Sequence, residues 1–297
     1  MNDEMFVLAF DHRGSFKSKM FGISGRTETA AEAAALQDAK HLVYEGALKA
    51  IDNGLSAELV GVLVDEEMGA DVAREAKERG IRLAMPVEKS GQPLFDFEYG
   101  DDFGEHIRQF DPEFSKVLVR WNPNDDPEDN RVQGQRLKRL GEWLKDHGKT
   151  YLFELLVPAT AQQLALVEST ADYDSEIRPY LTLQSIDQIL DAGVEPDIWK
   201  IEGLDRRRSC ELLSDLIRSG GRDDVIAVVL GRGADDAKVD HWLRMGSGVP
   251  GYAGFAIGRS IWWTGVEGFK DGSMSRSEAV DSIAANYRRF VDVYRTA

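Results

Sequence analysis

One lysine interrupts an apolar stretch in the last third of the chain. Lys200 lies within residues 197–203 (DIWKIEG), where apolar residues flank it on both sides. A lysine is rarely buried unless it is paired or used in chemistry. Burial disfavours the ammonium form, and the neutral amine is a nucleophile that forms Schiff bases with carbonyl substrates. Lys200 is therefore a candidate Schiff-base lysine. The alternative is an exposed strand end where it pairs with Glu202 or Asp197.

Two further charged residues lie in apolar stretches. Glu154 lies within residues 151–157 (YLFELLV), and Lys116 opens residues 116–120 (KVLVR). An unpaired buried carboxylate is costly, so Glu154 is expected to have a cationic or hydrogen-bonding partner. Alternation along a strand places Lys116 and Arg120 on one face. For Lys116 and Glu154 the alternative is a purely structural role.

Two glycine-rich turns form a second pattern. Residues 228–236 (VVLGRGADD) and 255–260 (FAIGRS) each carry an arginine directly after a glycine. Glycine lets backbone N–H groups approach an anion, helix N-termini favour negative charge, and arginine adds a forked contact. The pattern predicts phosphate binding at the two turns. The candidate residues are Gly231, Arg232, Gly233, Gly258, Arg259 and Ser260.

Composition limits the class of protein. The chain has 297 residues and a formal net charge of −16, which argues against nucleic acid and anionic membrane surfaces as partners. The single cysteine, Cys210, excludes an intrachain disulfide, and no apolar run approaches a membrane span. The N-terminus begins with Asp3 and Glu4 and has no cationic segment typical of a signal peptide. A cytoplasmic enzyme or binding protein is expected, and an oligomer of identical chains is compatible with these limits.

Eight short apolar runs alternate with longer amphipathic stretches. The expected strands are 5–10, 59–64, 81–87, 116–121, 151–157, 197–203, 225–230 and 252–257. The expected helices are 30–51, 69–79, 103–108, 127–147, two within 158–193, 209–219, 234–245 and 275–294. This alternation predicts parallel strands joined by crossover helices, and eight units predict one (β/α)₈ barrel over residues 1–297. The alternative is a doubly wound open sheet, although the chain has neither a G-x-G-x-x-G turn after the first strand nor a P-loop.

A barrel would gather polar residues at the carboxyl ends of its strands, where barrel enzymes place their catalytic groups. The loops after the seventh and eighth strands are the usual phosphate site of such barrels. Polar residues recur at these ends: Asp11, Asp65, Glu88, Arg120, Glu154, Lys200, Arg232 and Arg259.

The sequence resembles the class I, Schiff-base-forming aldolases of sugar phosphates. The segment around Lys200 is similar to the lysine strand of tagatose-bisphosphate and sulfofructose-phosphate aldolases, and the two Gly-Arg turns resemble their phosphate-binding turns. Residues 8–16 (LAFDHRGSF) resemble more closely the aldolase-like domain behind the kinase of some inositol-catabolism proteins, which is assigned to 6-phospho-5-dehydro-2-deoxygluconate aldolase activity. The 297 residues include no kinase domain, so a substrate different from that of the fused proteins is an open expectation.

This resemblance implies roles for individual residues. Lys200 would form an iminium with a phosphorylated keto-sugar, and Glu154 would transfer protons. Lys116 would be a second cation that lowers the pKa of Lys200, and Asp11 would hold a lysine or a substrate hydroxyl. The candidates for carboxylate or phosphate contacts are Arg13, Arg120, Arg232 and Arg259. No metal or cofactor is needed, because the iminium is the electron sink.

Two alternatives remain open at this point. A metal-dependent barrel lyase or epimerase would use Asp65, Glu66 and Glu88 as oxygen ligands. A non-catalytic sugar-phosphate sensor would keep the phosphate turns without needing a buried amine. His12 has no accompanying His or Cys cluster, so a metal role is not expected for it. It should point away from Asp11 if the first strand continues.

Overall fold

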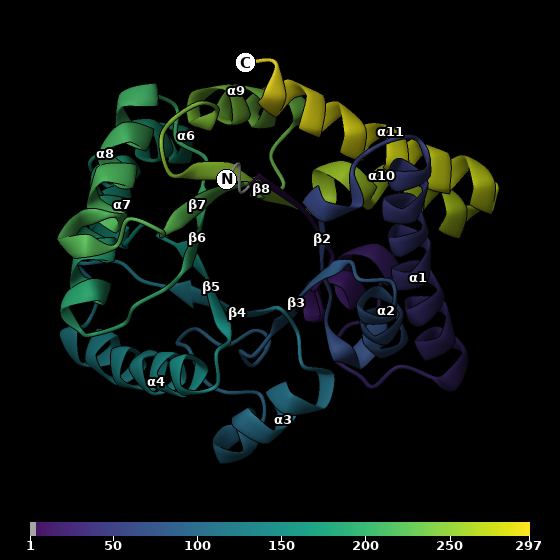
Figure 1. Ribbon diagram of the computed structural model, residues 1–297, viewed down its shortest axis with the longest axis horizontal. Helices are drawn as coiled ribbons and strands as arrows, with labels where there is room; N and C mark the ends of the chain where they lie inside the picture. Colours follow the sequence, from purple (N-terminus) through teal and green to yellow (C-terminus); the bar gives the residue numbers. More distant parts are fainter. Residues whose placement is uncertain (1–3) are drawn as a thin grey trace.

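The computed structural model describes residues 4–297, which form a closed barrel of eight parallel strands (Figure 1). Each strand pairs with the next one along the chain, and the last pairs with the first. The strands are β1 (Met5–Ala9), β2 (Val60–Leu63), β3 (Arg82–Pro86), β4 (Phe114–Arg120), β5 (Thr150–Leu156), β6 (Ile198–Glu202), β7 (Ile226–Leu230) and β8 (Tyr252–Ile257). The (β/α)₈ barrel is therefore confirmed, and the doubly wound open sheet is wrong.

Helices surround the barrel on its outer side (Figure 1). The α-helices are α1 (Ala30–Asp52), α2 (Glu66–Glu78), α3 (Phe103–Phe110), α4 (Pro127–Asp146), α5 (Ala161–Leu164), α6 (Thr170–Asp172), α7 (Arg178–Asp191), α8 (Arg207–Ile217), α9 (Asp236–Gly246), α10 (Arg259–Asp271) and α11 (Arg276–Arg295). The short 3₁₀ and π-helical turns are η1 (Phe16–Met20), η2 (Ala57–Leu59), η3 (Gly100–Asp102), η4 (Tyr173–Ile177) and η5 (Ser219–Gly221). Among residues 4–297, no helix is both long and apolar enough to span a bilayer.

Most boundaries differ from those expected from sequence by one to three residues, and two differences concern elements that position pocket residues. No helix was predicted between residues 258 and 275, yet α10 begins directly after β8. Its N-cap is Gly258, which makes no side-chain capping bond, so the usual start signal is missing. Strand β4 begins at Phe114, two residues before the expected start, so Lys116 lies inside the strand rather than at its opening.

The barrel interior is built in layers by the alternation of side chains along each strand. The lower layer is apolar and includes Phe114, Leu152 and Ile198. Two residues further along their strands, the same face carries Lys116, Glu154 and Lys200. The pairing of β5 with β6 places Glu154 opposite Lys200. The register of the sheet therefore brings charged side chains together above an apolar floor.

The first and last long helices, α1 and α11, pack against each other on the outside of the barrel. Helices α1, α10 and α11 lie on one side of the molecule (Figure 1). Gly46 of α1 lies so close to α11 that a Cβ atom there would be 2.3 Å from Cγ2 of Ile283. The hydroxyl of Tyr287 on α11 donates to the carbonyl of Phe6 on β1. These contacts tie the two ends of the chain together.

Candidate active site

A pocket of about 550 Å³ opens at the carboxyl ends of the strands. Its wall contains seven cationic and three acidic side chains, although the whole chain carries a net charge of −16. The cations are Arg13, Lys89, Lys116, Arg120, Lys200, Arg232 and Arg259. The acids are Asp11, Glu88 and Glu154. A cationic pocket on an acidic protein indicates an anionic ligand.

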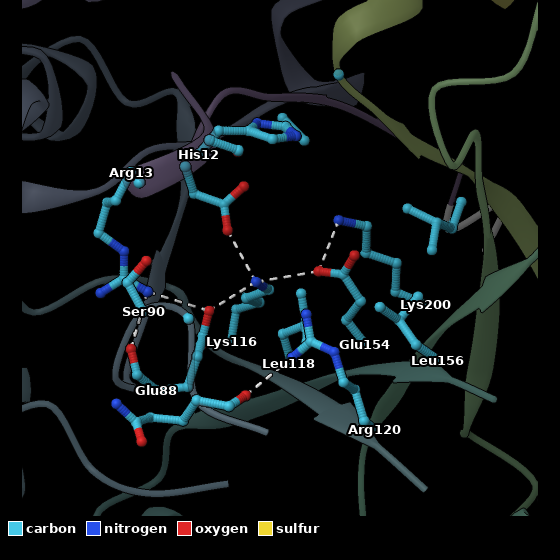
Figure 2. Close-up of a pocket in the computed structure, with 18 of the residues that line it drawn as sticks. His12, Arg13, Glu88, Ser90, Lys116, Leu118, Arg120, Glu154, Leu156 and Lys200 are labelled. Atoms are coloured by element: carbon cyan, nitrogen blue, oxygen red, sulfur yellow. Dashed lines mark hydrogen bonds and ion pairs between the residues drawn. The ribbon is translucent and has the colours of Figure 1, made fainter. Parts of the chain in front are cut away.

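Lys200 lies at the floor of this pocket and is paired with Glu154 (Figure 2). The distance from Nζ of Lys200 to Oε2 of Glu154 is 3.0 Å, and the two side chains are only 3% and 7% exposed. The pairing of Lys200 with Glu202 or Asp197, the alternative considered from sequence, is not found. Glu202 instead accepts from the backbone N–H of Val157, and Asp197 from that of Tyr151.

Lys116 lies between three carboxylates at the centre of the cluster (Figure 2). Its Nζ is 2.8 Å from Asp11, 2.9 Å from Glu88 and 3.0 Å from Glu154. Burial acts to lower the pKa of Lys116, but the three carboxylates raise it by more, so the ammonium form is strongly favoured. Lys116 and Lys200 reach the same oxygen of Glu154, so the expected direct juxtaposition of two cations is replaced by a bridge through a carboxylate.

The three carboxylates differ in their protonation equilibria. Burial acts to raise the pKa of Asp11 and of Glu154, but Lys116 and Lys200 lower it by more, so both pKa values lie below their usual range. At Glu88 burial prevails over Lys116 and Arg13, and the pKa is raised. Glu154 is therefore ionised near neutral pH, as a group that receives a proton must be, although its lowered pKa makes it a weaker base than a free carboxylate.

Glu88 was not among the catalytic residues selected from sequence, although it ends a predicted strand. It joins the cluster because Arg13 holds it from the other side. Arg13 donates to the Glu88 carbonyl at 2.8 Å and contacts the Glu88 carboxylate at 3.3 Å and Glu98 at 3.2 Å. Arg13 is thus committed to carboxylates, and the predicted contact of its guanidinium with substrate would compete with these bonds. In the sequence, the charged pair Glu88-Lys89 directly after the third strand was the feature that could have indicated this role.

The two glycine-rich turns lie side by side at the pocket wall. Gly233, Gly258 and Arg259 line the pocket, and Nη2 of Arg259 donates to the carbonyl of Arg232 at 3.0 Å. The predicted residues Gly231 and Ser260 are not part of the lining. Ser260 donates its hydroxyl to the carbonyl of Ala234 at 3.1 Å, so it joins the two turns to each other.

Arg232 also lines the pocket but points its guanidinium at carboxylates. It lies 2.6 Å from Asp174 and 3.0 Å from Glu202. Its φ of 54° is left-handed, a conformation uncommon outside glycine. Sequence reasoning placed Arg232 beside Arg259 as an equal phosphate ligand, and the structure separates their partners. Of the two, only Arg259 has no carboxylate partner among the described residues.

Arg120 and Lys89 supply positive charge on the opposite side of the mouth. Arg120 ends β4, which lies across the closed barrel from β8, where Arg259 follows. The one hydrogen bond of its guanidinium within residues 4–297 goes to the carbonyl of Gln92 at 3.1 Å. Lys89 is exposed and lines the same wall. The pocket therefore has cations at two ends with Lys200 of β6 between them.

His12 lines the pocket together with Asp11, whereas opposite faces were expected. The expectation fails because β1 ends at Ala9 and the chain turns. Burial is the main cause that lowers the pKa of His12 to about 4, with Lys40, Arg259 and Lys200 also disfavouring the charged ring and Asp11 acting in the opposite direction. Its imidazole is therefore neutral near pH 7.

The acidic residues proposed for the metal-dependent alternative do not converge. Asp65 pairs with Lys40, and Glu66 pairs with His106 and accepts from Tyr99. Within residues 4–297, no group of three or more His, Cys, Asp or Glu side chains is arranged to hold a metal ion. The three carboxylates that do meet, around Lys116, already surround an ammonium group.

Comparison with known proteins gives a family match over the whole chain. The family described as "Uncharacterized protein conserved in bacteria (DUF2090)" matches residues 1–297. The chain belongs to this family. No curated protein matches this DUF2090 chain by sequence.

Solved structures resemble this DUF2090 barrel at low sequence identity. One comes from a structural study of reaction intermediates of the Schiff base-forming fructose-1,6-bisphosphate aldolase. It has a TM-score of 0.58 and 13% identity, over 97% of this chain and 94% of the other. Another is Cgl0159 from Corynebacterium glutamicum, with a TM-score of 0.55 and 17% identity, over 97% and 86%. At these identities the likeness shows a shared barrel fold.

Proposed function

We propose that this DUF2090 barrel is a class I aldolase that uses Lys200 as its Schiff-base lysine. The observation that carries the proposal is the Lys200 amine, 3.0 Å from Glu154, at the floor of an open pocket lined by cations. A buried amine beside an ionised carboxylate has a base to take its proton, as a nucleophilic lysine requires. The fold shared with a Schiff base-forming aldolase is consistent with this chemistry.

The reaction would run through Lys200 with Glu154 as the proton carrier. Glu154 takes a proton from the Lys200 ammonium, and the amine adds to the ketone carbon to give a carbinolamine. Glu154 returns the proton to the departing hydroxyl, which leaves as water, and an iminium forms. Glu154, ionised again, then takes the proton of the substrate hydroxyl on the carbon that will become the aldehyde, and the electrons of the adjacent C–C bond move into the iminium, which releases the aldehyde and leaves an enamine. Protonation and hydrolysis of the enamine restore Lys200.

The substrate proposed is a phosphorylated keto-sugar or keto-sugar acid. Gly233, Gly258 and Arg259 would bind the phosphate, since they combine close backbone approach, a helix N-terminus and a guanidinium without a carboxylate partner among the described residues. Arg120 and Lys89 would bind a second negative group across the mouth. A substrate with these features is 6-phospho-5-dehydro-2-deoxygluconate, which would give dihydroxyacetone phosphate and an aldehyde acid, in keeping with the resemblance to inositol-catabolism aldolases.

Reductive trapping tests this proposal directly. Incubation with dihydroxyacetone phosphate and sodium borohydride should add the reduced ligand covalently to Lys200, as read by intact mass and peptide mapping. Lys200→Met should give no adduct while it still binds inorganic phosphate. A wild-type protein that binds the phosphate without any adduct would refute the Schiff-base mechanism and leave a sugar-phosphate-binding barrel.

A further inference from the structure

A third buried lysine, Lys40, lies outside the pocket and bonds to the backbone on both sides of Asp11. Lys40 lies on α1 and its side chain is 0% exposed. Its Nζ donates to the carbonyl of Phe10, to the carbonyl of His12 at 2.9 Å and to Oδ1 of Asp65 at 2.5 Å. An ammonium group has three N–H donors, so all three are used.

These two carbonyls belong to a segment without regular backbone pairing. The N–H of Phe10 still donates to the carbonyl of Leu63 at 2.8 Å, but residues 10–13 belong to no helix or strand. Buried carbonyls that lose their ladder partners need other donors. Lys40 supplies a donor to the residue before Asp11 and to the residue after it. The backbone orientation of Asp11 is thereby fixed from outside the barrel.

Asp65 is the third partner of the Lys40 ammonium and links it to the start of α2. It follows β2, is fully buried, and its Oδ2 accepts from the N–H of Met68 at the start of α2. The Lys40 charge is therefore neutralised without using any carboxylate of the pocket. A buried, paired and fully hydrogen-bonded lysine is rigid, since displacing it would leave Asp65 as an unpaired buried charge.

We infer that Lys40 and Asp65 are positioning residues for the reaction, acting through the Asp11 backbone to hold the Asp11 carboxylate against Lys116. This inference rests on the proposed aldolase function. The Asp11 carboxylate reaches from β1 to Lys116 on β4, a strand not adjacent to it, and lies 2.8 Å from Nζ. Lys116 in turn contacts Glu154, which contacts Lys200. The bonds to the Phe10 and His12 carbonyls therefore set the geometry of the series of ion pairs that runs from Asp11 to the Lys200 amine.

The test compares wild type with K40M/D65N, which removes the ammonium without leaving an unpaired buried carboxylate and keeps a capping side chain for α2. Adduct formation at Lys200 should slow by about tenfold or more, because small displacements of reacting groups have large effects on rate. Binding of inorganic phosphate should stay close to wild type, since the phosphate turns follow β7 and β8. Leu42→Ala, a cavity variant on the same helix, should lower the melting temperature without slowing adduct formation.

A pH profile separates positioning from a general loss of stability. Asp11 raises the pKa of Glu154, so displacing Asp11 should move the acid limb of adduct formation to lower pH in K40M/D65N and leave it unmoved in Leu42→Ala. If K40M/D65N does not fold, K40Q/D65N, which retains an amide donor near one carbonyl, should show a smaller change in the same direction.

The outcomes distinguish the two proposals. A folded K40M/D65N or K40Q/D65N protein that traps ligand at the wild-type rate and with the wild-type pH profile overturns the positioning role alone. Absence of an adduct in wild type overturns the aldolase function and the positioning role with it.

Discussion

Glu154 lies between two lysine side chains that would otherwise face each other above the apolar layer of the barrel interior. Lys116 and Lys200 both lie 3.0 Å from its Oε2 atom. Lys116 is additionally held by Asp11 and Glu88, whereas the one ion pair of Lys200 within residues 4–297 is with Glu154. The two lysines therefore have different partners. Lys116 holds three carboxylates together, and Lys200 is the amine to which the proposed mechanism assigns the Schiff base.

Glu154→Gln tests the proton carrier at the residue scale. The amide keeps the shape of the side chain but cannot accept the Lys200 proton. Adduct formation with dihydroxyacetone phosphate and borohydride should fall by roughly 10²–10⁴-fold, the usual contribution of a general acid–base group. Glu142→Gln, which alters an exposed carboxylate of α4, is the control and should trap at the wild-type rate. Equal rates for the two variants would remove Glu154 from the mechanism.

The turns after β7 and β8 illustrate how elements create a site that single residues do not. Gly233 has a φ of 73°, and a Cβ atom there would lie 2.6 Å from Nη2 of Arg259. Gly258 has a negative φ but is equally crowded, since a Cβ atom there would lie 2.4 Å from the carbonyl oxygen of Ala9. The absence of a side chain at Gly233 leaves room for the Arg259 guanidinium, which bonds to the carbonyl of Arg232.

Gly233→Ala is expected to weaken anion binding by the turn that follows β7. The methyl group would strain the left-handed backbone and displace Arg259, so the affinity for inorganic phosphate should fall by about tenfold, the effect of losing one hydrogen bond to a charged group. Isothermal titration calorimetry measures the change. Gly80→Ala is the matched control, because its φ is 70° and nothing lies within 4 Å of its virtual Cβ. A comparable loss of affinity in both variants would contradict the assignment.

The pH dependence of folding belongs to the whole molecule, because the groups around His12 come from both ends of the chain. His12 follows β1 and packs edge-on against Trp262 of α10 at a ring distance of 5.6 Å. Its pKa is lowered from 6.5 to about 4, mainly by burial. The unfolded chain therefore binds a proton at His12 between these two values while the folded chain does not. The free energy of unfolding rises with pH in this window and falls as the solution is acidified.

Replacing His12 should remove this part of the pH dependence. Between pH 6.5 and pH 4, wild type should lose up to about 3 kcal/mol of stability relative to its value at neutral pH from this group, and His12→Gln should lose correspondingly less. Urea unfolding at several pH values gives the difference between the two proteins. Leu42→Ala should shift the wild-type curve downward without changing its slope. Parallel curves for wild type and His12→Gln would contradict a buried neutral imidazole.

Several features of this barrel could be predicted from sequence because they are local. The eight strand candidates were visible from short apolar runs bounded by polar residues, and the alternation with helices led to the correct fold. Lys200 and Glu154 stood out because a charged residue inside an apolar run indicates either an ion-pair partner or a role in chemistry. The same register that buries Ile198 and Leu152 raises Lys200 and Glu154 to the pocket two residues later.

The remaining features depend on partners far apart in the chain. Only the folded barrel places Glu88 and Asp11 beside Lys116, turns Arg232 toward Glu202 and Asp174, and leaves Arg259 facing the pocket.

Sequence alone determined which charged side chains lie within apolar strands, because hydrophobic patterning is a local property of the chain. Tertiary structure decided which of them meet, because ion pairs such as Lys40–Asp65 and Lys116–Asp11 depend on how the barrel closes rather than on spacing along the chain.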